Sequence, residues 1–286
     1  MENNDDPSKI QHHIRHILTK RLTPALLQTY NKKLELLRMC SFYIKVIQVD
    51  HSQYDHNCAS SSTVMSLIDI QRFQRMKKLG NSQVKIQLAL LEELLDSLSR
   101  GCEELQAILD RERLDEGAIK EGAIKEKIFK LLQEAAEFKD VLVPSRLHLK
   151  HHLISEVSST RVPQIQLALS IRMPVRFDKT KCAASSDSII LHWDITEQEQ
   201  HEPGEQFKIC YKLFHPTTEA EGNLMAQIAC ASYCLRIDNL MPDRFYEFTV
   251  QRVDSWLSVY SLWIDAIILK TVSGTIGSSE ENTEKN

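Results

Sequence analysis

The chain has little glycine, with eight such residues among 286. Loops that cradle phosphates need closely spaced glycines, because only glycine lets the backbone approach the phosphate without a side chain in the way. The sequence lacks Gly-x-x-x-x-Gly-Lys-Ser/Thr, Gly-x-Gly-x-x-Gly, Gly-x-Ser-x-Gly and His-Glu-x-x-His. We therefore expect no cofactor and no catalytic residue, and a protein that is not an enzyme.

Long apolar runs and an excess of positive charge are also missing. No stretch of eighteen apolar residues occurs, and the acidic opening Met1-Glu2-Asn3-Asn4-Asp5-Asp6 differs from the basic start of a secretory signal. The formal net charge of −4 gives no overall attraction to nucleic acid or anionic lipid. These features predict a protein that binds neither nucleic acid nor membrane.

A disulfide framework is absent as well. The chain has seven cysteines, an odd number, with no framework spacing, and it has no Asn-x-Ser/Thr glycosylation site. Free thiols among apolar residues behave as small hydrophobic side chains. A reducing, intracellular and cytoplasmic location is the prediction. The cysteines are Cys40, Cys58, Cys102, Cys182, Cys210, Cys230 and Cys234.

A Leu-x-Pro-x-x-x-Tyr turn, from Leu240 to Tyr246, runs directly into an alternating apolar stretch. In a β-sandwich such a turn is a tyrosine corner, whose hydroxyl bonds nearby backbone while its ring packs under the connection. Alternating runs predict further strands around it, with Trp193 at the centre of the core. The predicted strands are 173–177, 189–194, 207–213, 230–237, 248–253 and 262–271. Their order resembles a fibronectin type III domain over residues 170–273.

The N-terminal half is predicted to be helical. Apolar residues from Val84 to Leu109 recur in alternating steps of four and three, a heptad stripe typical of a coiled coil, with Asn81-Ser82 as its N-cap. Similar stripes predict helices at 7–20, 24–49 and 126–143. The fold class is therefore α+β: an antiparallel helical bundle at 8–160, a fibronectin type III β-sandwich at 170–273 and a disordered tail at 274–286.

The arrangement of both halves resembles a small family, fibronectin type III domain-containing protein 11. The resemblance rests on Pro163-Gln164-Ile165-Gln166-Leu167 and on Ile171-Arg172-Met173-Pro174-Val175-Arg176-Phe177, which lead from the helical region into the sandwich. It spans nearly the whole chain and implies a non-enzymatic scaffold or adaptor. It transfers no catalytic or ligand residue. A place in a cilium or flagellum is an expectation attached to such proteins.

Histidines form three groups that merit a test as metal ligands. His148 and His152 lie one helical turn apart, and His51 and His56 lie near Cys58, but neither set supplies four ligands and no Cys-x-x-Cys accompanies them. The third group is at positions 12, 13 and 16. Solvated side chains explain these groups more simply, so no metal site is predicted.

Two stretches have the composition of binding surfaces. Residues 9–33 contain six basic residues and no acidic one, among them Lys20, Arg21, Lys32 and Lys33. This stretch either forms a solvated helix face or meets an acidic partner such as the tails of tubulin. The segment between the fifth and sixth predicted sandwich strands carries Trp256 and Tyr260, and aromatic side chains often anchor partners.

From these features we expect an intracellular scaffold or adaptor that binds other proteins through its fibronectin type III domain and its basic helices. The alternative is a structural component of a filament or an axonemal microtubule assembly, in which the heptad stripe from Val84 to Leu109 pairs with another chain. Burial of that stripe within one molecule would weaken the alternative. The sequence identifies neither the partner nor the oligomeric state.

Overall fold

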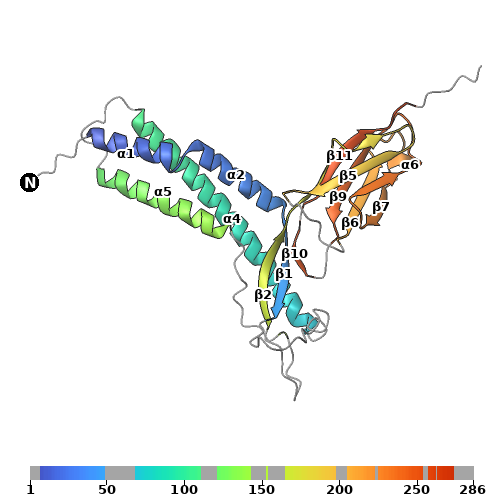
Figure 1. Cartoon of the computed structure of the whole chain (residues 1–286), viewed down its shortest axis with the longest axis horizontal. Coiled ribbons are helices and arrows are strands. Elements are labelled where there is room, and N and C mark those ends of the chain that lie inside the picture. Colours follow the sequence, from blue (N-terminus) through green and yellow to red (C-terminus); the bar gives the residue numbers. More distant parts are fainter. Residues whose placement is uncertain are drawn as a thin grey trace, which may run out of the picture. The chain divides into compact units, whose positions relative to one another are not determined.

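The chain folds as two compact units (Figure 1). The first comprises Met1–Arg172 together with Trp256–Ser261, and the second comprises Met173–Ser255 and Leu262–Asn286. The computed structural model describes residues 7–48, 68–110, 121–142, 153, 165–197, 205–222, 225–253, 257–261 and 263–273. The predicted tail at 274–286 lies outside these residues.

The described residues of the first unit form the helices α1 (Pro7–Lys20), α2 (Pro24–Met39), α4 (Ile70–Leu109) and α5 (Glu121–Val141). Figure 1 shows α1, α2 and α5 alongside α4. Helices α4 and α5 run antiparallel, because Ser97 bonds Glu134 (2.9 Å) while Glu104, further along α4, pairs with Lys127, earlier in α5. The predicted antiparallel helical bundle is thus confirmed.

The heptad stripe of α4 is used inside this unit. Leu91, Leu98 and Leu105 are completely buried, and they face apolar side chains of the neighbouring helices. Tyr30 of α2 stacks on Phe138 of α5 with their ring centroids 4.5 Å apart. The stripe therefore forms the core of one molecule, and this weakens the alternative in which it pairs with a second chain.

Helix α2 is shorter than its apolar pattern predicts. It ends at Met39, and Cys40 takes an extended conformation (φ −69°, ψ 149°). Residues Ser41–Gln48 then form strand β1. The predicted helix to residue 49 is wrong, because the aromatic and β-branched run from Phe42 to Ile47 favours a strand, where such side chains pack well.

Helix α4 begins fourteen residues before the predicted start at Val84. Asp69 caps it, since its Oδ1 accepts from the backbone N–H groups of Gln71 (2.9 Å) and Arg72 (3.0 Å). The predicted cap at Asn81-Ser82 is wrong. Asn81 lies within the helix and donates from its side chain to the carbonyl of Val259 (2.6 Å).

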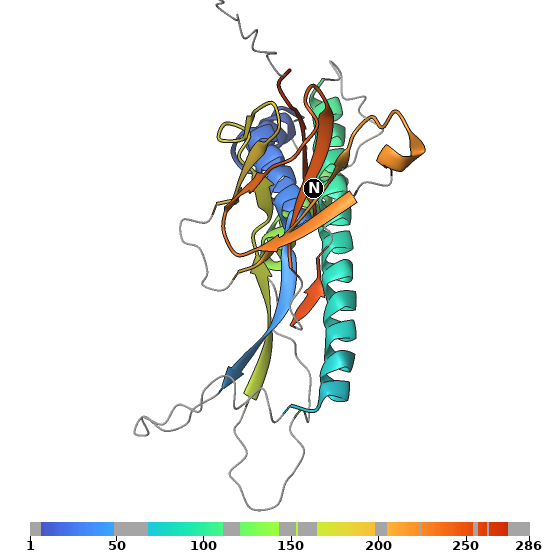
Figure 2. The same cartoon turned by 90° about the vertical axis from the view of Figure 1, so that its right-hand side faces the viewer.

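A three-stranded antiparallel sheet completes the first unit, in the order β10-β1-β2. Strand β1 pairs along its whole length with β2 (Ile165–Arg172), and its other edge pairs with β10 (Ser258–Tyr260). Figures 1 and 2 show β1 and β2 as neighbours. Gly80 of α4 leaves room for β10, because a Cβ there would lie 3.4 Å from Cγ1 of Val259.

The second unit is a sandwich of two antiparallel sheets. One has the order β11-β9-β6-β7, and in the other β5 pairs with β3, β4 and β8. Leu191, Trp193, Phe207 and Phe248 lie at its core. The strands are β3 (Val175–Phe177), β4 (Ala183–Ala184), β5 (Ile189–Ile195), β6 (Phe207–Leu213), β7 (Met225–Cys230), β8 (Cys234–Ile237), β9 (Phe245–Arg252) and β11 (Asp265–Lys270), with the short helix α6 (Glu219–Gly222) before β7.

The tyrosine corner has the predicted geometry. The backbone N–H of Met241 donates to the hydroxyl of Tyr246 over 2.9 Å, and the Tyr246 side chain is buried.

Two predicted strands need correction. The single strand at 230–237 is two strands in different sheets, β7 and β8, separated by bends at 231–233. The last strand begins at Asp265 rather than at 262.

Candidate partner-binding surface

Helices α1 and α2 carry the basic stretch predicted from the sequence, and their caps and apolar faces decide which side chains remain outside. Ile14 and Ile17 are buried on α1, and Leu34 is buried on α2. Thr23 caps α2 by accepting the N–H of Leu26 (3.1 Å), and Pro24 follows in the first turn, where its missing N–H costs nothing. Burial of the apolar stripes turns the cationic side chains outward.

All six cations of this stretch are exposed, and within the part of the chain that the structure describes none of them forms an ion pair. Arg38, one turn further along α2, is different, because it contacts Glu35 (2.6 Å) and Glu92 (2.7 Å). The first two helices therefore present an uncompensated positive charge on a protein whose net charge is −4. We call the six residues the basic surface: Lys9, Arg15, Lys20, Arg21, Lys32 and Lys33.

The two aromatic candidates have different places. Trp256 lies outside the described residues. Tyr260 is half-buried in β10, and its ring meets that of Phe42 edge-on at 6.0 Å between centroids. Tyr260 was predicted to lie between two sandwich strands, but its segment forms a strand of the first unit. Partner binding by either residue stays a prediction.

A second basic cluster escaped the sequence analysis. Between Asp69 and Glu92 the chain has five basic residues and no acidic one. The structure places them on the first half of α4, where Arg75, Lys78 and Lys85 are exposed. The absence of acidic residues between Asp69 and Glu92 is the sequence signal for this cluster. The apolar heptad pattern predicts a helix only from Val84 onward, so it does not place these residues on one helix.

The three histidine groups considered as metal ligands are described only in part. The three histidines of α1 at positions 12, 13 and 16 are exposed, and the other two groups lie outside the described residues. Among the residues that are described, no three His, Cys, Asp or Glu side chains are grouped as metal ligands. Burial raises the pKa of the Cys102 and Cys182 thiols, which disfavours the reactive thiolate.

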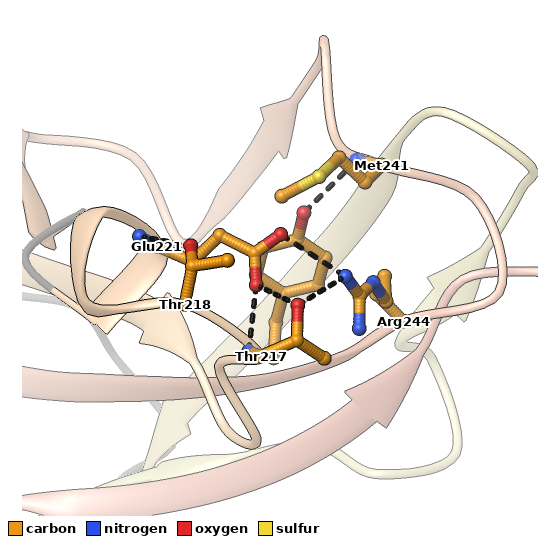
Figure 3. A network of polar contacts seen from close by, with 6 residues as sticks. Thr217, Thr218, Glu221, Met241 and Arg244 are labelled. Carbon is orange, nitrogen blue, oxygen red and sulfur yellow. Dashed lines mark hydrogen bonds and ion pairs between the residues drawn. The ribbon is translucent and has the colours of Figure 1, made fainter.

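Charged groups with shifted pKa values in the sandwich are engaged in structural contacts. Glu221 accepts from both the N–H and the hydroxyl of Thr217 (2.7 Å each), and Arg244 lies 3.0 Å away (Figure 3). The Thr217 hydrogen bonds, and then Arg244, lower the pKa of the Glu221 carboxyl. This network ties the connection after β6 to the start of β9.

A second network is buried. Arg252 Nη2 lies 3.0 Å from Glu205 Oε1 as an ion pair without hydrogen-bond alignment, and their side chains are 9% and 4% exposed. Tyr233 donates its hydroxyl to Glu205 Oε2 (2.5 Å), and Arg252 donates to the carbonyl of Met173 (3.0 Å). Burial, and then the contact with Glu205, raises the pKa of the Tyr233 phenol. These contacts fix where the chain enters the sandwich.

Comparison with known proteins connects both units to one family. A protein from Bos taurus named fibronectin type III domain-containing protein 11 is 38% identical over 262 residues, which cover 91% of this chain and 78% of the relative. This chain belongs to the fibronectin type III domain-containing protein 11 family. The Homo sapiens protein of the same name is 37% identical, over 90% of this chain and 81% of its own length.

Family models divide the chain of this family member in two. The model described as "Family of unknown function (DUF5581) N-terminal domain" matches residues 8–167, and the "Fn3-like domain" of the same family matches 172–277. Among solved structures, the fibronectin type III domain of human fibronectin type III domain containing protein 3 is 15% identical, with a TM-score of 0.26, over 34% of this chain and 84% of that domain. The structure titled "Myokine structure" is 16% identical, with a TM-score of 0.25, over 32% of this chain and 93% of its own.

Among the described helices, none combines the length and the apolar character needed to cross a lipid bilayer.

Proposed function

We propose that this protein is a non-enzymatic intracellular scaffold or adaptor that binds an acidic partner protein through the basic surface. The observation that supports this most is the exposure of six cations on α1 and α2 without an ion pair among the described residues. Exposed cations elsewhere in the described structure are divided: Lys181 pairs with Asp178 (2.9 Å) and Lys212 with Glu247 (2.7 Å), whereas dispersed ones such as Lys139 form no ion pair among the described residues. The six positive charges of the basic surface are therefore available to an acidic partner.

The partner class follows from charge. A flexible acidic segment, such as the glutamate-rich tails of tubulin, would place carboxylates against this face and be drawn to it by long-range attraction. Single exposed ion pairs contribute about 0.2–1 kcal/mol each, so several are needed for measurable affinity. Such binding is weakened by salt, because the charges remain close to solvent.

The Fn3-like domain supports the interaction role, since it carries its own core and offers a second surface on the same chain. The alternative of a structural component in a filament or axonemal microtubule assembly now rests on the basic surface, because most of the heptad stripe is buried. A cytoplasmic location, and a cilium or flagellum as the site of a tubulin partner, belong to the same proposal.

The test uses the full chain and a fluorescent peptide of glutamate residues in an anisotropy titration. Replacing Lys20, Arg21, Lys32 and Lys33 by Glu should weaken binding about tenfold or more, the sum of four modest ion pairs. Raising the salt concentration should reduce the affinity of the natural chain and have a smaller effect on the variant.

A matched control variant distinguishes an effect of this local surface from an effect of the net charge. Lys45, Arg100, Lys139 and Lys179 are exposed, are dispersed over other elements and form no ion pair among the described residues. Changing these four to Glu gives the same net charge and should alter affinity much less than the first variant. Equal losses in the two variants would show that only overall charge matters, and that result would refute the proposal.

A further inference from the structure

Strand β7 is the terminal strand of its sheet and lacks the features that normally protect an edge. It pairs with β6 on one side, and no described residue pairs with its other side. Its sequence, Met-Ala-Gln-Ile-Ala-Cys, contains no charge and no proline, and its register with β6 is continuous. Natural edge strands are usually interrupted by lysine, proline or a bulge, which prevent another strand from pairing.

The opposite edge of the same sheet is different. Strand β11 begins with Asp265 and ends with Lys270, so both of its ends carry a charge. In the other sheet, β3 contains Arg176 and β8 contains Arg236. Among the described sandwich strands longer than two residues at a sheet edge, β7 is therefore the uncharged one.

The hydrogen-bond pattern identifies which backbone groups of β7 are free. The N–H of Phe214 donates to the carbonyl of Phe245 (2.9 Å), and that of Val253 donates to Gln206 (2.8 Å). Even-numbered residues in and beside β6 thus bond toward β9, and odd-numbered ones bond toward β7. Because Tyr211 pairs with Ala226, the even-numbered residues of β7 face β6.

It follows that Met225, Gln227 and Ala229 direct their N–H and C=O groups toward the outer edge. The side chains of these three residues are also exposed. A row of available donors and acceptors at strand spacing is satisfied best by another extended backbone. This requirement sets the occupant's conformation: it is a β-strand.

An apolar pocket lies beside this edge. Its volume is about 290 Å³, and every residue that lines it is uncharged. Met225 and Ala226 of β7 form one wall, Tyr211 of β6 another, and Met241 and Tyr246 of the tyrosine corner a third. The Tyr246 hydroxyl accepts the N–H of Met241 (Figure 3), and apolar surface makes up most of the lining, so the pocket suits an apolar side chain.

We propose that β7 is a docking site for an extended, uncharged segment of another protein, which adds a fifth strand to the sheet. A large apolar side chain of that segment, such as Leu, Met or Phe, enters the pocket beside Met225. Backbone hydrogen bonds supply affinity and the pocket supplies specificity, which is the usual division in strand addition. The methionines at the rim adapt to the shape of the anchor.

The composition of β7 argues against a second copy of this chain as the occupant. Symmetric antiparallel pairing of two β7 strands brings the end near Cys230 of one copy opposite the end near Met225 of the other. Full overlap sets Ile228 of one copy opposite Ala226 of the other, but Ile228 and Cys230 pack against the core of their own sandwich, and Ala229 is too small to fill the pocket. A different protein with a large apolar residue meets both requirements.

The experiment selects peptides from a phage-displayed library of random twelve-residue sequences on the full natural chain. Selected peptides should share one large apolar residue within an uncharged, β-prone stretch. Anisotropy with synthetic copies of these peptides then compares two variants. Gln227→Pro removes an outward N–H without breaking a bond to β6, and should weaken binding at least tenfold. Gln227→Ala keeps that N–H and should bind within twofold of the natural chain.

Three further readouts decide the outcome. Urea unfolding followed by tryptophan fluorescence should give the same midpoint for the two Gln227 variants. Bound peptide should slow hydrogen exchange of the backbone N–H groups of Met225, Gln227 and Ala229, but not of those along β11. The four-site reversal of the basic surface should bind these peptides normally, so failure here is distinct from failure of the proposed function. The proposal would be overturned if the selected peptides bound Gln227→Pro as tightly as the natural chain. It would also be overturned if the library gave no enriched peptides, or if the natural chain associated with itself and Gln227→Pro abolished that association.

Discussion

At the scale of single residues, Tyr246 shows how one hydroxyl stabilises the sandwich. It accepts the N–H of Met241 in a buried position, so Tyr246→Phe leaves that N–H without its partner. The expected loss is about 1–2 kcal/mol in the unfolding free energy of the second unit. Urea unfolding followed by tryptophan fluorescence measures it, because Trp193 lies in the core of that unit.

Tyr211→Phe is the control for this change. Tyr211 is half-buried on the neighbouring strand, and its hydroxyl bonds no described residue. The urea midpoint of the Tyr211→Phe variant should match that of the natural chain. If Tyr246→Phe also unfolds at the natural urea concentration, the corner hydrogen bond has no role in stability.

Two glycines on the helices of the first unit should respond in opposite directions to the same change. A Cβ at Gly101 of α4 would overlap both methyl carbons of Leu131 on α5, whereas at Gly122 it would meet nothing within 4 Å. Gly101→Ala should destabilise the helices by about 1–2 kcal/mol through overpacking. Gly122→Ala should stabilise them by up to about 1 kcal/mol. Urea unfolding followed by circular dichroism at 222 nm tests both, and a gain in stability at Gly101 would contradict the close packing of α4 on α5.

The phenol of Tyr233 should make the sandwich sensitive to alkali. Burial raises its pKa above the ordinary value of 10.0, so the folded state holds this proton more tightly than the unfolded state. The resulting stabilisation is complete below about pH 10 and declines as the pH rises above it. Between pH 9 and 11 the natural chain should lose stability more steeply than Tyr233→Phe in unfolding followed by tryptophan fluorescence. Identical slopes would show that the phenol titrates as it does in the unfolded chain.

At the scale of elements, β10 is the unexpected one, because a segment between two sandwich strands forms part of the other unit. Val259 is buried against Gly80, and its carbonyl accepts from Asn81. Val259→Ala should therefore lower the stability of the helical unit by about 1–2 kcal/mol, with a smaller effect on the sandwich. Both chains carry Trp256→Phe in this experiment, so that the remaining tryptophans belong to the second unit, and unfolding by circular dichroism and by tryptophan fluorescence then separates the two units.

Val253→Ala serves as the control for β10, since this valine belongs to the same connection but is 39% exposed. It should change neither transition by more than about 0.5 kcal/mol. Should Val259→Ala shift only the sandwich transition, β10 would have to be assigned to that unit.

Local patterns predicted the elements whose partners are close in sequence or whose signature is specific. The tyrosine corner and the core strand with Trp193 were found because alternation and the Leu-x-Pro-x-x-x-Tyr turn define them locally. Strand β1 was mistaken for the end of a helix, since the run from Phe42 to Ile47 gains its strand partners from residues 165–172 and 258–260. Pairing over such separations leaves no local mark.

The candidate surface was partly predictable for the same reason. Lys20, Arg21, Lys32 and Lys33 form a charge run that is visible in the sequence, and their exposure follows from the apolar stripe beside them. The fate of Tyr260 was not predictable, because its three-residue strand pairs with β1 more than two hundred positions earlier. The free edge of β7 required the strand order of the whole sheet.

At the scale of the whole molecule, the two units are connected by more than one passage of the chain. The chain leaves the first unit after Arg172, returns to it for Trp256–Ser261 and then completes the sandwich with β11. A fragment that ends at residue 172 therefore lacks a strand of its own sheet. For this reason the functional experiments above use the full chain.

The two proposals assign the two units different chemistry. The first unit presents positive charge on α1 and α2 that pairs with no described residue, and the second presents an uncharged strand edge beside an apolar pocket. On these proposals the protein holds an acidic partner and an extended apolar segment at the same time. This is the property expected of a scaffold, and it needs no catalytic group.

Proximity labelling in cells that express the protein tests the central claim most directly. It compares the natural chain, the variant with Lys20, Arg21, Lys32 and Lys33 changed to Glu, and the dispersed control with Lys45, Arg100, Lys139 and Lys179 changed to Glu. We expect a defined set of neighbours with acidic surfaces to disappear in the first variant and to persist in the control. The same neighbours in all three forms would contradict a partner-binding role for the basic surface.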